Sequence, residues 1–347
     1  MTHFLQDIHR QPDELKRTLE RLSGPGRSAL DEAVAAVRSA RHVYLTGIGS
    51  SWHAGLNVSA LFQIAGRPVY LMDAAEMLQF ASIPVGSVLI VISRSGRSVE
   101  IVQLLDKARE SRAAVIGITN VPDGTLAREA QIPIVIPVAL DHAISVNTYT
   151  TLALAAGVLA ASITGAFDAP LAESLSRSFA ATARQIPGWR AQIENSPWLA
   201  PKSVTYFLAR GSSLGSAYEA RLMWEEGVKS PATAMGAASF RHGPQEIVGK
   251  DVRFGIWIDA TKMRDQDLAL ARDLRKLGAR VMLIGQRLPS DDADLVFNLP
   301  EIPTPWQFVI DIIPAQLAAE RLARLSGSDP DTFKLCSFIV EDESGLL

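Results

Sequence analysis

Three serines around a glycine form the segment whose spacing most clearly predicts ligand binding. The segment reads Ser93-Arg94-Ser95-Gly96-Arg97-Ser98, and it lies between an apolar run that predicts a strand and a helical pattern. Its three hydroxyls could surround an anion while the N–H groups of the helix N-terminus point at it. Such neutral donors suit a phosphate monoester, and either arginine could add a charged fork. The competing explanation is helix capping, for which serine is common.

A second turn of the same kind follows the first predicted strand. It contains Gly47, Gly49, Ser50 and Ser51 and again opens a helical pattern, which suits a bound anion. A dinucleotide fingerprint is the alternative interpretation. That fingerprint requires glycine where Trp52 stands. Only an aspartate at the end of the second predicted strand, Asp73, favours it.

The later part of the chain contains a candidate acid–base pair. Glu219 and Glu226 are seven positions apart in a helical pattern and should share a face, whereas Glu225 lies on another face. His242 follows in the sequence Phe-Arg-His-Gly-Pro. Because a helix does not readily continue through Gly-Pro, we expect His242 in a loop or at a helix boundary. Glu and His together suit proton transfer beside a carbonyl, although acids on a helix are commonly a solvated surface.

Composition argues against several other classes of function. The chain has 347 residues, with 34 Lys and Arg against 37 Asp and Glu, so bulk electrostatic binding of nucleic acid is not expected. The single cysteine rules out a disulfide within the chain and a cysteine-based zinc site. None of the six histidines forms a closely spaced ligand pair, so we expect no metal and no cofactor. His53 either faces the ligand or packs in the core.

Short apolar runs place both turns at the ends of predicted strands. The runs lie at Val43–Gly47, Pro68–Met72, Val88–Ser93, Ala114–Thr119 and Ile132–Pro137. Apolar residues on both faces are typical of parallel strands covered by helices, and a helical stripe at Ser98–Arg109 supplies one such cover. This order of strand, turn and helix predicts a doubly wound α/β fold.

The same order returns after a predicted connecting helix at 168–195. Strands are expected at Val204–Ala209, Phe254–Asp259 and Val281–Gly285, and helices at Leu214–Gly227, Asp265–Leu277 and about Trp306–Leu325. The sequence Gly-Ser-Ser recurs at 211–213 after the first strand of this half. We therefore predict two copies of one α/β module, each a doubly wound, mostly parallel sheet with helices on both faces.

The remaining segments predict helices and no membrane span. Pro12–Arg41 reads as two helices broken at Ser23–Gly26. Ala143–Phe167 carries no charge, but its many Ala, Thr, Ser and Gly residues favour a buried, closely packed helix over a transmembrane one. The N-terminus lacks the basic start and apolar stretch of a signal peptide, so we expect a cytoplasmic protein.

Together these motifs resemble the sugar isomerase (SIS) domain family. Its members include the isomerase half of glucosamine-6-phosphate synthase, amino-sugar-phosphate deaminases and fructosamine-phosphate deglycases. The resemblance covers roughly residues 40–341 and rests on the Gly-Ser-Ser turn, the serine loop, the helix from Glu219 to Glu226, and His242-Gly243-Pro244. It implies two SIS domains at 41–167 and 202–328, with N-terminal helices at 1–40, a connecting helix at 168–201 and a tail at 329–347.

The resemblance also implies roles for individual residues. Ser93, Arg94, Ser95 and Ser98 would bind the phosphate of a sugar, with Gly49, Ser50, Ser51 and Ser145 close to the same substrate. Glu226 would move a proton between C1 and C2 through a cis-enediol or enamine. His242 would open the sugar ring and would be supplied by a partner subunit, which implies a homodimer.

Departures from the family pattern shape the expected reaction. Arg94 and Arg97 replace a glutamine and a glutamate, and the family's catalytic lysine falls on Cys336, two residues after Lys334, which could substitute for it. No N-terminal cysteine or glutaminase domain is present, so ammonia from glutamine is not expected. We expect an isomerase or deaminase of a hexosamine 6-phosphate or ketosamine phosphate. The alternatives are a fructosamine-6-phosphate deglycase and a non-catalytic sugar-phosphate sensor.

Overall fold

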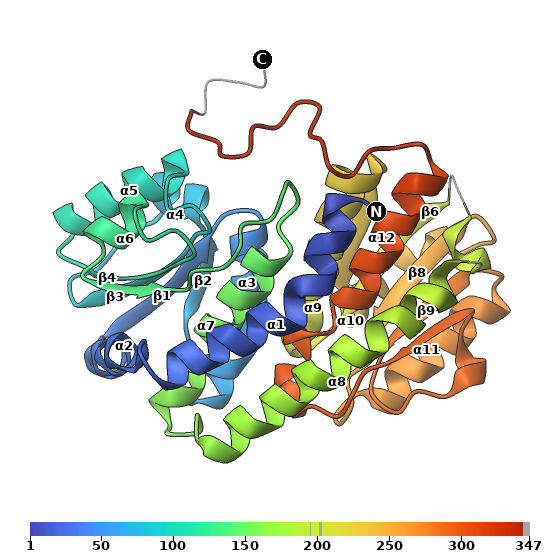
Figure 1. Cartoon of the computed structure of the whole chain (residues 1–347), viewed down its shortest axis with the longest axis horizontal. Helices are drawn as coiled ribbons and strands as arrows, with labels where there is room; N and C mark the ends of the chain where they lie inside the picture. The colour runs from blue at the N-terminus through green and yellow to red at the C-terminus, as the bar shows by residue number, and fades with distance from the viewer. Residues whose placement is uncertain (195, 201–202, 343–347) are drawn as a thin grey trace. The chain divides into compact units, whose positions relative to one another are not determined.

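The chain forms two five-stranded sheets, and the strands within each sheet run parallel to one another (Figure 1). The computed structural model describes residues 1–194, 196–200 and 203–342. The first-sheet unit comprises Asp13–Asp141, Ser145–Ser176 and Phe333–Leu347. The second-sheet unit comprises Met1–Pro12, His142–Ile144 and Arg177–Thr332. Helix α1 (His3–Ser23) begins in the second-sheet unit and α8 (Ala169–Glu194) begins in the first-sheet unit, and each ends in the other.

The first sheet has the strand order β2-β1-β3-β4-β5. Its strands are β1 (His42–Gly47), β2 (Tyr70–Asp73), β3 (Ser87–Ile92), β4 (Ala114–Thr119) and β5 (Ile132–Val135). Every side chain of the central strand β3 is buried, as expected for a strand covered on both faces. The chain therefore crosses from β2, at one edge, to the far side of β1 when it enters β3.

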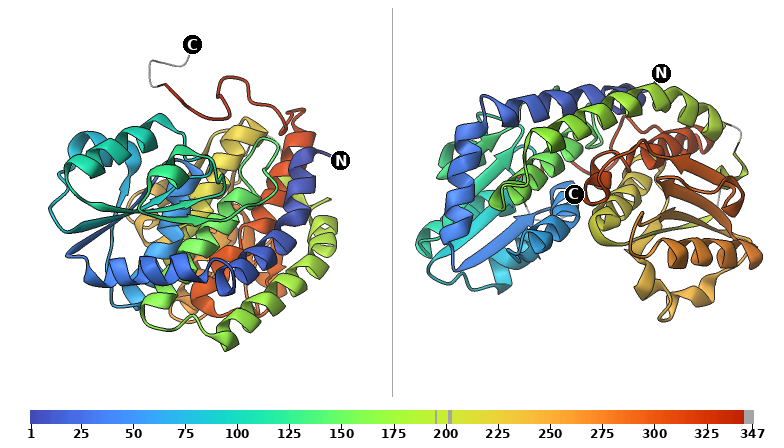
Figure 2. Two further views of the ribbon diagram at one scale, coloured as in Figure 1. Left: turned by 60° about the vertical axis from the view of Figure 1, so that its left-hand side comes forward. Right: turned by 90° about the horizontal axis from the view of Figure 1, so that it is seen from below.

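Helices cover both faces of the first sheet (Figure 1 and Figure 2). One face packs against α4 (Ala74–Phe80), α5 (Val99–Glu110) and α6 (Thr125–Glu129), and a second layer contains α2 (Arg27–Ser39), α3 (Ser50–Ile64) and α7 (Asn147–Ile163). Nearly every side chain of α7 is buried, because its small residues let it pack closely against α3 and α2. Among the described residues, no helix combines the length and apolar character needed to cross a bilayer.

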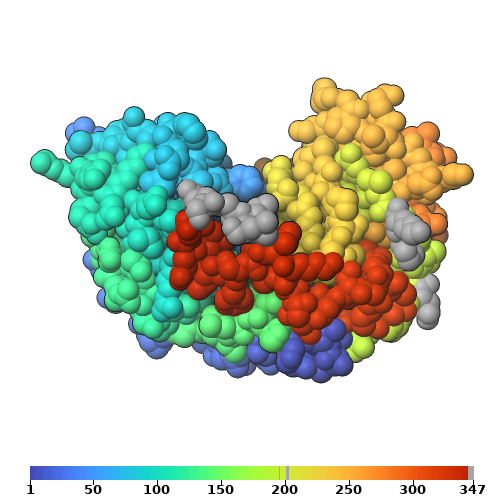
Figure 3. Space-filling view, turned by 90° about the horizontal axis from the view of Figure 1, so that it is seen from above, coloured from blue at the N-terminus to red at the C-terminus, as the bar shows by residue number. Residues whose placement is uncertain are grey.

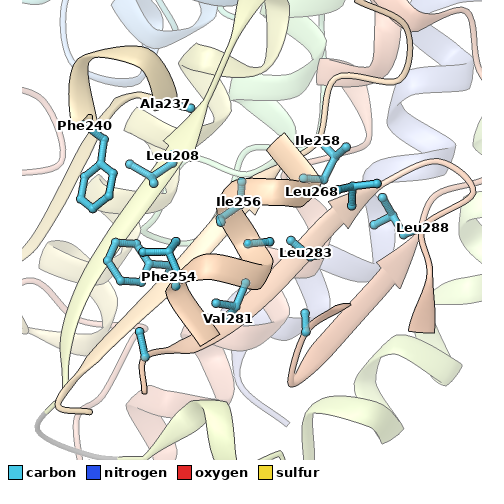
Figure 4. Close-up of a cluster of buried hydrophobic side chains, with 14 of the residues drawn as sticks. Leu208, Ala237, Phe240, Phe254, Ile256, Ile258, Leu268, Val281, Leu283 and Leu288 are labelled. Atoms are coloured by element: carbon cyan, nitrogen blue, oxygen red, sulfur yellow. The ribbon is translucent and has the colours of Figure 1, made fainter. Parts of the chain in front are cut away.

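The second sheet repeats this topology with the order β10-β9-β8-β6-β7. Its strands are β6 (Val204–Ala209), β7 (Ala232–Gly236), β8 (Val252–Trp257), β9 (Arg280–Gly285) and β10 (Leu295–Asn298). Its helices are α9 (Leu214–Met223), α10 (Ala237–Phe240), α11 (Arg264–Lys276) and α12 (Ile313–Leu325). A core that includes Leu208, Phe240, Phe254 and Leu283 fills one face (Figure 4).

Short turns of 3-10 or π helix join these elements. They are η1 (Pro197–Leu199), η2 (Gly211–Ser213), η3 (Trp224–Val228), η4 (Pro244–Ile247), η5 (Ser290–Asp292) and η6 (Thr304–Val309), of which η3 is a π turn. The predicted helix at Trp306–Leu325 is thus divided into η6 and α12.

The predicted fold class is confirmed, and the differences concern edges and termini. Strands β7 and β10 lie at the two edges of the second sheet and were not predicted, because an edge strand can be short and only partly apolar. Helix α1 begins at His3 rather than near Pro12, which lies inside it. The Thr2 hydroxyl accepts from the Leu5 N–H, and the Asp331 carboxylate accepts from the Phe4 N–H, so the earlier start has acceptors for its free amides.

Candidate functional site

The two glycine-serine turns leave neighbouring strands at the carboxyl edge of the first sheet. Strands β1 and β3 pair in parallel, with Thr46 opposite Val91, while the connections from them lead to opposite sides of the sheet. This is the switch point of a doubly wound sheet, where such folds bind ligands. The structure therefore brings the Gly49–Ser51 turn and the 93–98 loop to the same edge of the sheet.

The first turn packs tightly against the end of β3. A Cβ atom on Gly47 would lie 2.9 Å from the Ile92 carbonyl oxygen, so only glycine fits there without a shift. Gly49 has a φ of +55°, and Ser50 then begins α3. Ser51 is buried in the first turn of that helix. The close approach brings the start of α3 next to the loop that follows Ile92.

Hydrogen bonds fix the serine loop internally. The Ser93 hydroxyl accepts from the Gly96 N–H at 3.1 Å, and the Ser95 hydroxyl accepts from the Arg97 N–H at 3.2 Å. A hydroxyl that accepts in this way still has its own proton to donate to a ligand. Ser98 occupies the N-cap position of α5 but makes no side-chain capping bond. Capping therefore does not account for the Ser98 hydroxyl.

A left-handed residue at Gly96 closes the same loop. Its φ is +64°, and a Cβ atom there would lie 2.8 Å from the Cβ of Leu126. The Leu126 N–H donates to the Gly96 carbonyl at 3.0 Å, which holds the loop against the start of α6. Both the backbone conformation and the packing therefore require glycine at this position.

The two arginines of the loop have different surroundings. Arg97 is exposed and forms an ion pair with Asp123 at 3.3 Å. Arg94 donates to the Ser145 hydroxyl at 3.2 Å and to the Phe338 carbonyl, and its guanidinium lies 4.0 Å from the centre of the Phe338 ring. Ser145, selected only through the family resemblance, is thus beside the serine loop.

A buried aspartate that the sequence analysis missed positions Ser145. The Asp141 carboxylate accepts from the backbone N–H groups of Val146, Asn147 and Thr148, each at 2.9 Å. It also accepts from the Thr148 hydroxyl and the Asn147 amide, both at 2.7 Å. These bonds cap the start of α7 and fix the turn that contains Ser145. An aspartate shortly before an Asn-Thr helix start was the available signal.

In the second sheet, the loop after β8 corresponds to the serine loop after β3, and a carboxylate of the same loop accepts hydrogen bonds from its backbone N–H groups. Asp259 follows β8 and accepts from the N–H groups of Thr261 at 2.9 Å and Met263 at 3.2 Å, and also from Lys262. Burial raises the pKa of Asp259, but these backbone bonds outweigh it and hold the pKa below its usual value. The Asp259 carboxylate thus occupies the anion-binding loop, or cradle, that follows β8, whereas serine hydroxyls form the corresponding cradle that follows β3.

The Gly-Ser-Ser turn of the second sheet also has an internal partner. The Ser213 hydroxyl donates to the carboxylate of Asp311 at 2.6 Å. Asp311 is fully buried, and this burial raises its pKa to about 7, although nearby hydroxyl donors oppose the change. Nothing in the local sequence around Ser213 indicates this partner.

Glu226 lies in a π turn rather than in a continuous α-helix. Helix α9 ends at Met223, and the wider turn η3 contains both Glu225 and Glu226. Glu219 is buried, Glu226 is half-buried and Glu225 is exposed, so Glu225 is the most accessible of the three carboxylates. π turns occur often at functional sites.

The π turn is fixed by contacts that the sequence did not predict. Lys229 has a φ of +59° and donates from Nζ to the Glu226 carbonyl and to the Thr332 carbonyl. A Cβ atom on Gly227 would lie 2.9 Å from the Ile144 side chain. The backbone that carries Glu226 is therefore held from both sides within the second-sheet unit.

His242 lies in a turn between α10 and η4, as predicted. Its side chain is exposed, its N–H donates to the Ser239 carbonyl at 3.0 Å, and the following Gly243 has a φ of +128°. Arg241, Gln245 and residues of α11 line a cavity of about 540 Å³ beside this turn. His242 and Glu226 belong to the second-sheet unit, whereas the serine loop belongs to the first-sheet unit.

Other candidates from the sequence are placed as follows. His53 is buried on α3, where its ring lies 5.7 Å from that of Trp52, consistent with the packing alternative. Lys334 and Cys336 are exposed in the tail.

Comparison with known proteins identifies a family model and relatives that this chain resembles. Residues 36–173 match the SIS domain family model. The chain is 28% identical over 334 residues to a glutamine–fructose-6-phosphate aminotransferase (isomerizing) of Sulfurisphaera tokodaii, covering 95% of this chain and 55% of that protein. It thus spans about half the length of that relative.

Two solved structures share the fold. The C-terminal domain of glucosamine-fructose-6-phosphate aminotransferase from Francisella tularensis aligns with a TM-score of 0.84 at 22% identity, covering 96% of this chain and 98% of that one. A glucosamine-6-phosphate deaminase from Thermotoga maritima aligns with a TM-score of 0.80 at 22% identity, covering 98% and 99% of the two chains.

Proposed function

We propose that this chain belongs to the SIS domain family, whose model matches residues 36–173, and that it is an enzyme acting on a phosphorylated sugar. The observation that carries the proposal is the serine loop at the switch point of the first sheet. Its Ser93 and Ser95 hydroxyls accept from loop amides and retain protons to donate, and Ser98 is not used as a cap. Such an arrangement suits the oxygens of a phosphate monoester.

The proposed reaction moves one proton between adjacent carbons. The Glu226 carboxylate removes the C2 proton of the open-chain sugar and returns it to C1, through a cis-enediol or enamine. A positioned base of this kind contributes roughly 10²–10⁴ in rate. With a hexosamine 6-phosphate the product is a ketose imine, which water hydrolyses to release ammonia. With a ketosamine phosphate the reverse transfer would release an amine, the deglycase alternative.

His242 is assigned to opening the sugar ring. An imidazole can pass a proton between the ring oxygen and the C1 hydroxyl, because one of its nitrogens can accept a proton while the other donates one. The family resemblance assigns this histidine to the site of a partner subunit, so we propose a homodimer in which the exposed His242 reaches the partner's site. Lys334 remains the candidate amine in place of the family lysine, which aligns with Cys336.

A pair of neighbouring glutamates provides the test. Glu226→Gln should lower kcat with glucosamine 6-phosphate by at least about 10²-fold while leaving the affinity for the sugar phosphate within a few-fold. Glu225→Gln is the matched control, since Glu225 lies in the same π turn but is exposed. Ammonia release and aldose–ketose exchange are measured with glucosamine 6-phosphate, fructose 6-phosphate and fructosamine 6-phosphates. Equal turnover by both variants contradicts the role of Glu226.

A sugar-phosphate sensor is the second candidate function. The observation in its favour is the exposed Cys336 at the position of the family's catalytic lysine. A sensor would bind glucosamine 6-phosphate without turnover, and calorimetry would give the same affinity for the wild type and Glu226→Gln. Turnover by the wild type that disappears in Glu226→Gln excludes this candidate.

A further inference from the structure

The π turn that carries Glu226 begins at a tryptophan whose side chain is fully buried. Trp224 is 0% exposed, whereas Glu225 is exposed and Glu226 is half-buried. The chain around residue 225, in yellow, accordingly reaches the molecular surface in Figure 3. One short turn therefore joins a ring in the core of the second-sheet unit to a carboxylate that solvent can reach.

The backbone of Trp224 also closes this turn. Its carbonyl oxygen accepts from the N–H of Lys229, the bond that defines the π turn, and from the N–H of Ser230 at 3.1 Å. Glu226 lies between the acceptor and these two donors. A shift of Trp224 would therefore disturb both hydrogen bonds and, with them, the backbone that carries the Glu226 carboxylate.

Three side chains surround the indole ring of Trp224. Its ring centre lies 4.8 Å from that of Phe207 and 6.0 Å from that of Trp198, and both pairs meet edge to face. The guanidinium carbon of Arg253 lies 6.0 Å from the centre of the Trp224 ring and 5.3 Å from that of Trp198. Aromatic pairs in this geometry, and a cation over an indole, stabilise beyond the area that they bury. We call the side chains of Trp198, Phe207 and Arg253 the indole slot.

Neutral oxygen atoms hold the arginine of the slot in place. The Nε of Arg253 donates to the Thr205 hydroxyl at 2.7 Å, and an Nη donates to the Ala200 carbonyl at 3.0 Å. Burial, together with the charge of Arg280, lowers the pKa of Arg253 to about 10, so the guanidinium is still a cation at neutral pH. Because Thr205 is on β6 and Arg253 is on β8, two adjacent inner strands of the sheet fix the slot.

Hydrogen bonding by the indole does not explain why a tryptophan stands at position 224. Among the residues that the structure describes, the buried Nε1 atom of Trp224 has no hydrogen-bond partner. A buried donor without a partner is destabilising and is rare in folded proteins. What this position supplies is therefore the set of ring contacts inside the slot and the carbonyl that closes the π turn.

We propose that Trp224, held by the indole slot, is a positioning residue for the carboxylate of Glu226. The buried ring fixes the start of the π turn, the carbonyl closes the turn, and the base two residues later is thereby held in one place. This inference rests on the proposed function, because it assigns the residue that orients the proposed base. A misplacement of a reacting group by about 1 Å can lower a rate by about 10²-fold.

Two buried tryptophans of the second-sheet unit form a matched pair for the test. Trp189, on α8, is 4% exposed, and its ring contacts that of Phe297 at 6.3 Å, outside the indole slot. Kinetics use whichever of glucosamine 6-phosphate, fructose 6-phosphate and fructosamine 6-phosphates the wild type converts fastest. Trp224→Ala should lower kcat by about 10- to 100-fold and change KM by less than about threefold. Trp189→Ala loses the same buried ring and should keep kcat within about twofold of the wild type.

Two milder variants keep the test decisive if Trp224→Ala does not fold. Trp224→Phe keeps an aromatic ring in the slot and removes an N–H that bonds to none of the described residues, so it should retain most of the activity. Phe207→Leu leaves the π turn unaltered but removes one wall of the slot, so it should lower kcat by about three- to tenfold. Circular dichroism and urea denaturation measure the folding of each variant.

Amide exchange with deuterium gives a readout that does not depend on activity. The N–H groups of Lys229 and Ser230 both donate to the Trp224 carbonyl, so their exchange reports whether the π turn is closed. In Trp224→Ala their exchange, followed by mass spectrometry, should be faster by about tenfold or more. In Trp189→Ala it should match that of the wild type.

The outcomes separate this inference from the proposed function. Loss of kcat and faster exchange in Trp224→Ala, both absent from Trp189→Ala, support the positioning role. Unchanged kcat or unchanged exchange in a folded Trp224→Ala, or equal losses in the two alanine variants, overturn that role while wild-type turnover leaves the proposed function intact. If Trp224→Ala does not fold, unchanged kcat in Phe207→Leu overturns the role. Failure of the wild type to convert any of the sugar phosphates overturns both.

Discussion

Replacing Gly96 by alanine should damage the serine loop in two separable ways. The left-handed backbone, with a φ of +64°, costs an L-residue about 1–2 kcal/mol. The new Cβ would also lie 2.8 Å from the Cβ of Leu126, and relieving such overpacking costs typically about 1–3 kcal/mol. The two effects together predict a loss of about 2–5 kcal/mol in the free energy of unfolding of the first-sheet unit.

Gly165→Ala isolates the backbone contribution. Gly165 also has a left-handed φ, +76°, but its added Cβ would have no atom within 4 Å. This variant should therefore lose only about 1–2 kcal/mol. Urea denaturation followed by circular dichroism measures both losses, and calorimetry measures the affinity for inorganic phosphate.

The affinity for phosphate tests whether Gly96 shapes a binding loop or only stabilises the fold. Movement of Gly96 away from Leu126 displaces the amide that donates to the Ser93 hydroxyl, so Gly96→Ala should weaken phosphate binding by tenfold or more. Gly165→Ala should leave the affinity unchanged. If the two variants match in stability and in phosphate affinity, the assignment of Gly96 to the cradle is refuted.

Two buried aspartates give further predictions. Asp141→Ala removes the acceptor of three backbone N–H groups and should lower the free energy of unfolding by about 2–4 kcal/mol. The control Asp168→Ala removes an exposed cap and should lower it by only about 0.5–1 kcal/mol. Equal shifts of the urea midpoint in the two variants would contradict this prediction. Burial raises the pKa of Asp311 to about 7, so the folded state keeps a proton that the unfolded state, with a pKa of 3.8, has lost. Wild-type stability should therefore fall relative to Asp311→Asn by about 1.4 kcal/mol per pH unit between pH 5 and 7. A constant difference between these two proteins across that range would contradict the shift.

The strands and the two glycine-serine turns were predictable because their determinants are local. Runs such as Val88–Ser93 are apolar on both faces, which favours parallel strands, and the turns after β1 and β3 then meet at one edge of the sheet. The edge strands β7 and β10 are short and pair on one side only, so their sequences carry a weaker signal. The start of α1 escaped prediction because its free amides are satisfied by Asp331, far along the chain.

The partners of the site residues were not predictable, since each depends on tertiary contacts. Asp311 is 98 positions from Ser213, and Phe338 is 244 positions from Arg94. The π turn at Glu226 interrupts a helical pattern that continues in the sequence, and its fixing contacts come from Thr332 and Ile144. Sequence periodicity reports which side of an element is apolar, but it does not report which distant group will complete a hydrogen bond.

Because Asp259 occupies the cradle after β8, only the cradle after β3 can respond to solutes in the surrounding solution. A cradle filled by the chain itself is saturated as soon as the protein folds, at any solute concentration. Under the proposed function, the cradle after β3 instead gains stability as a phosphate ester accumulates, in proportion to the logarithm of the ester concentration. Resistance to heat or proteases should then rise with the ester concentration in the first-sheet unit and stay constant in the second-sheet unit.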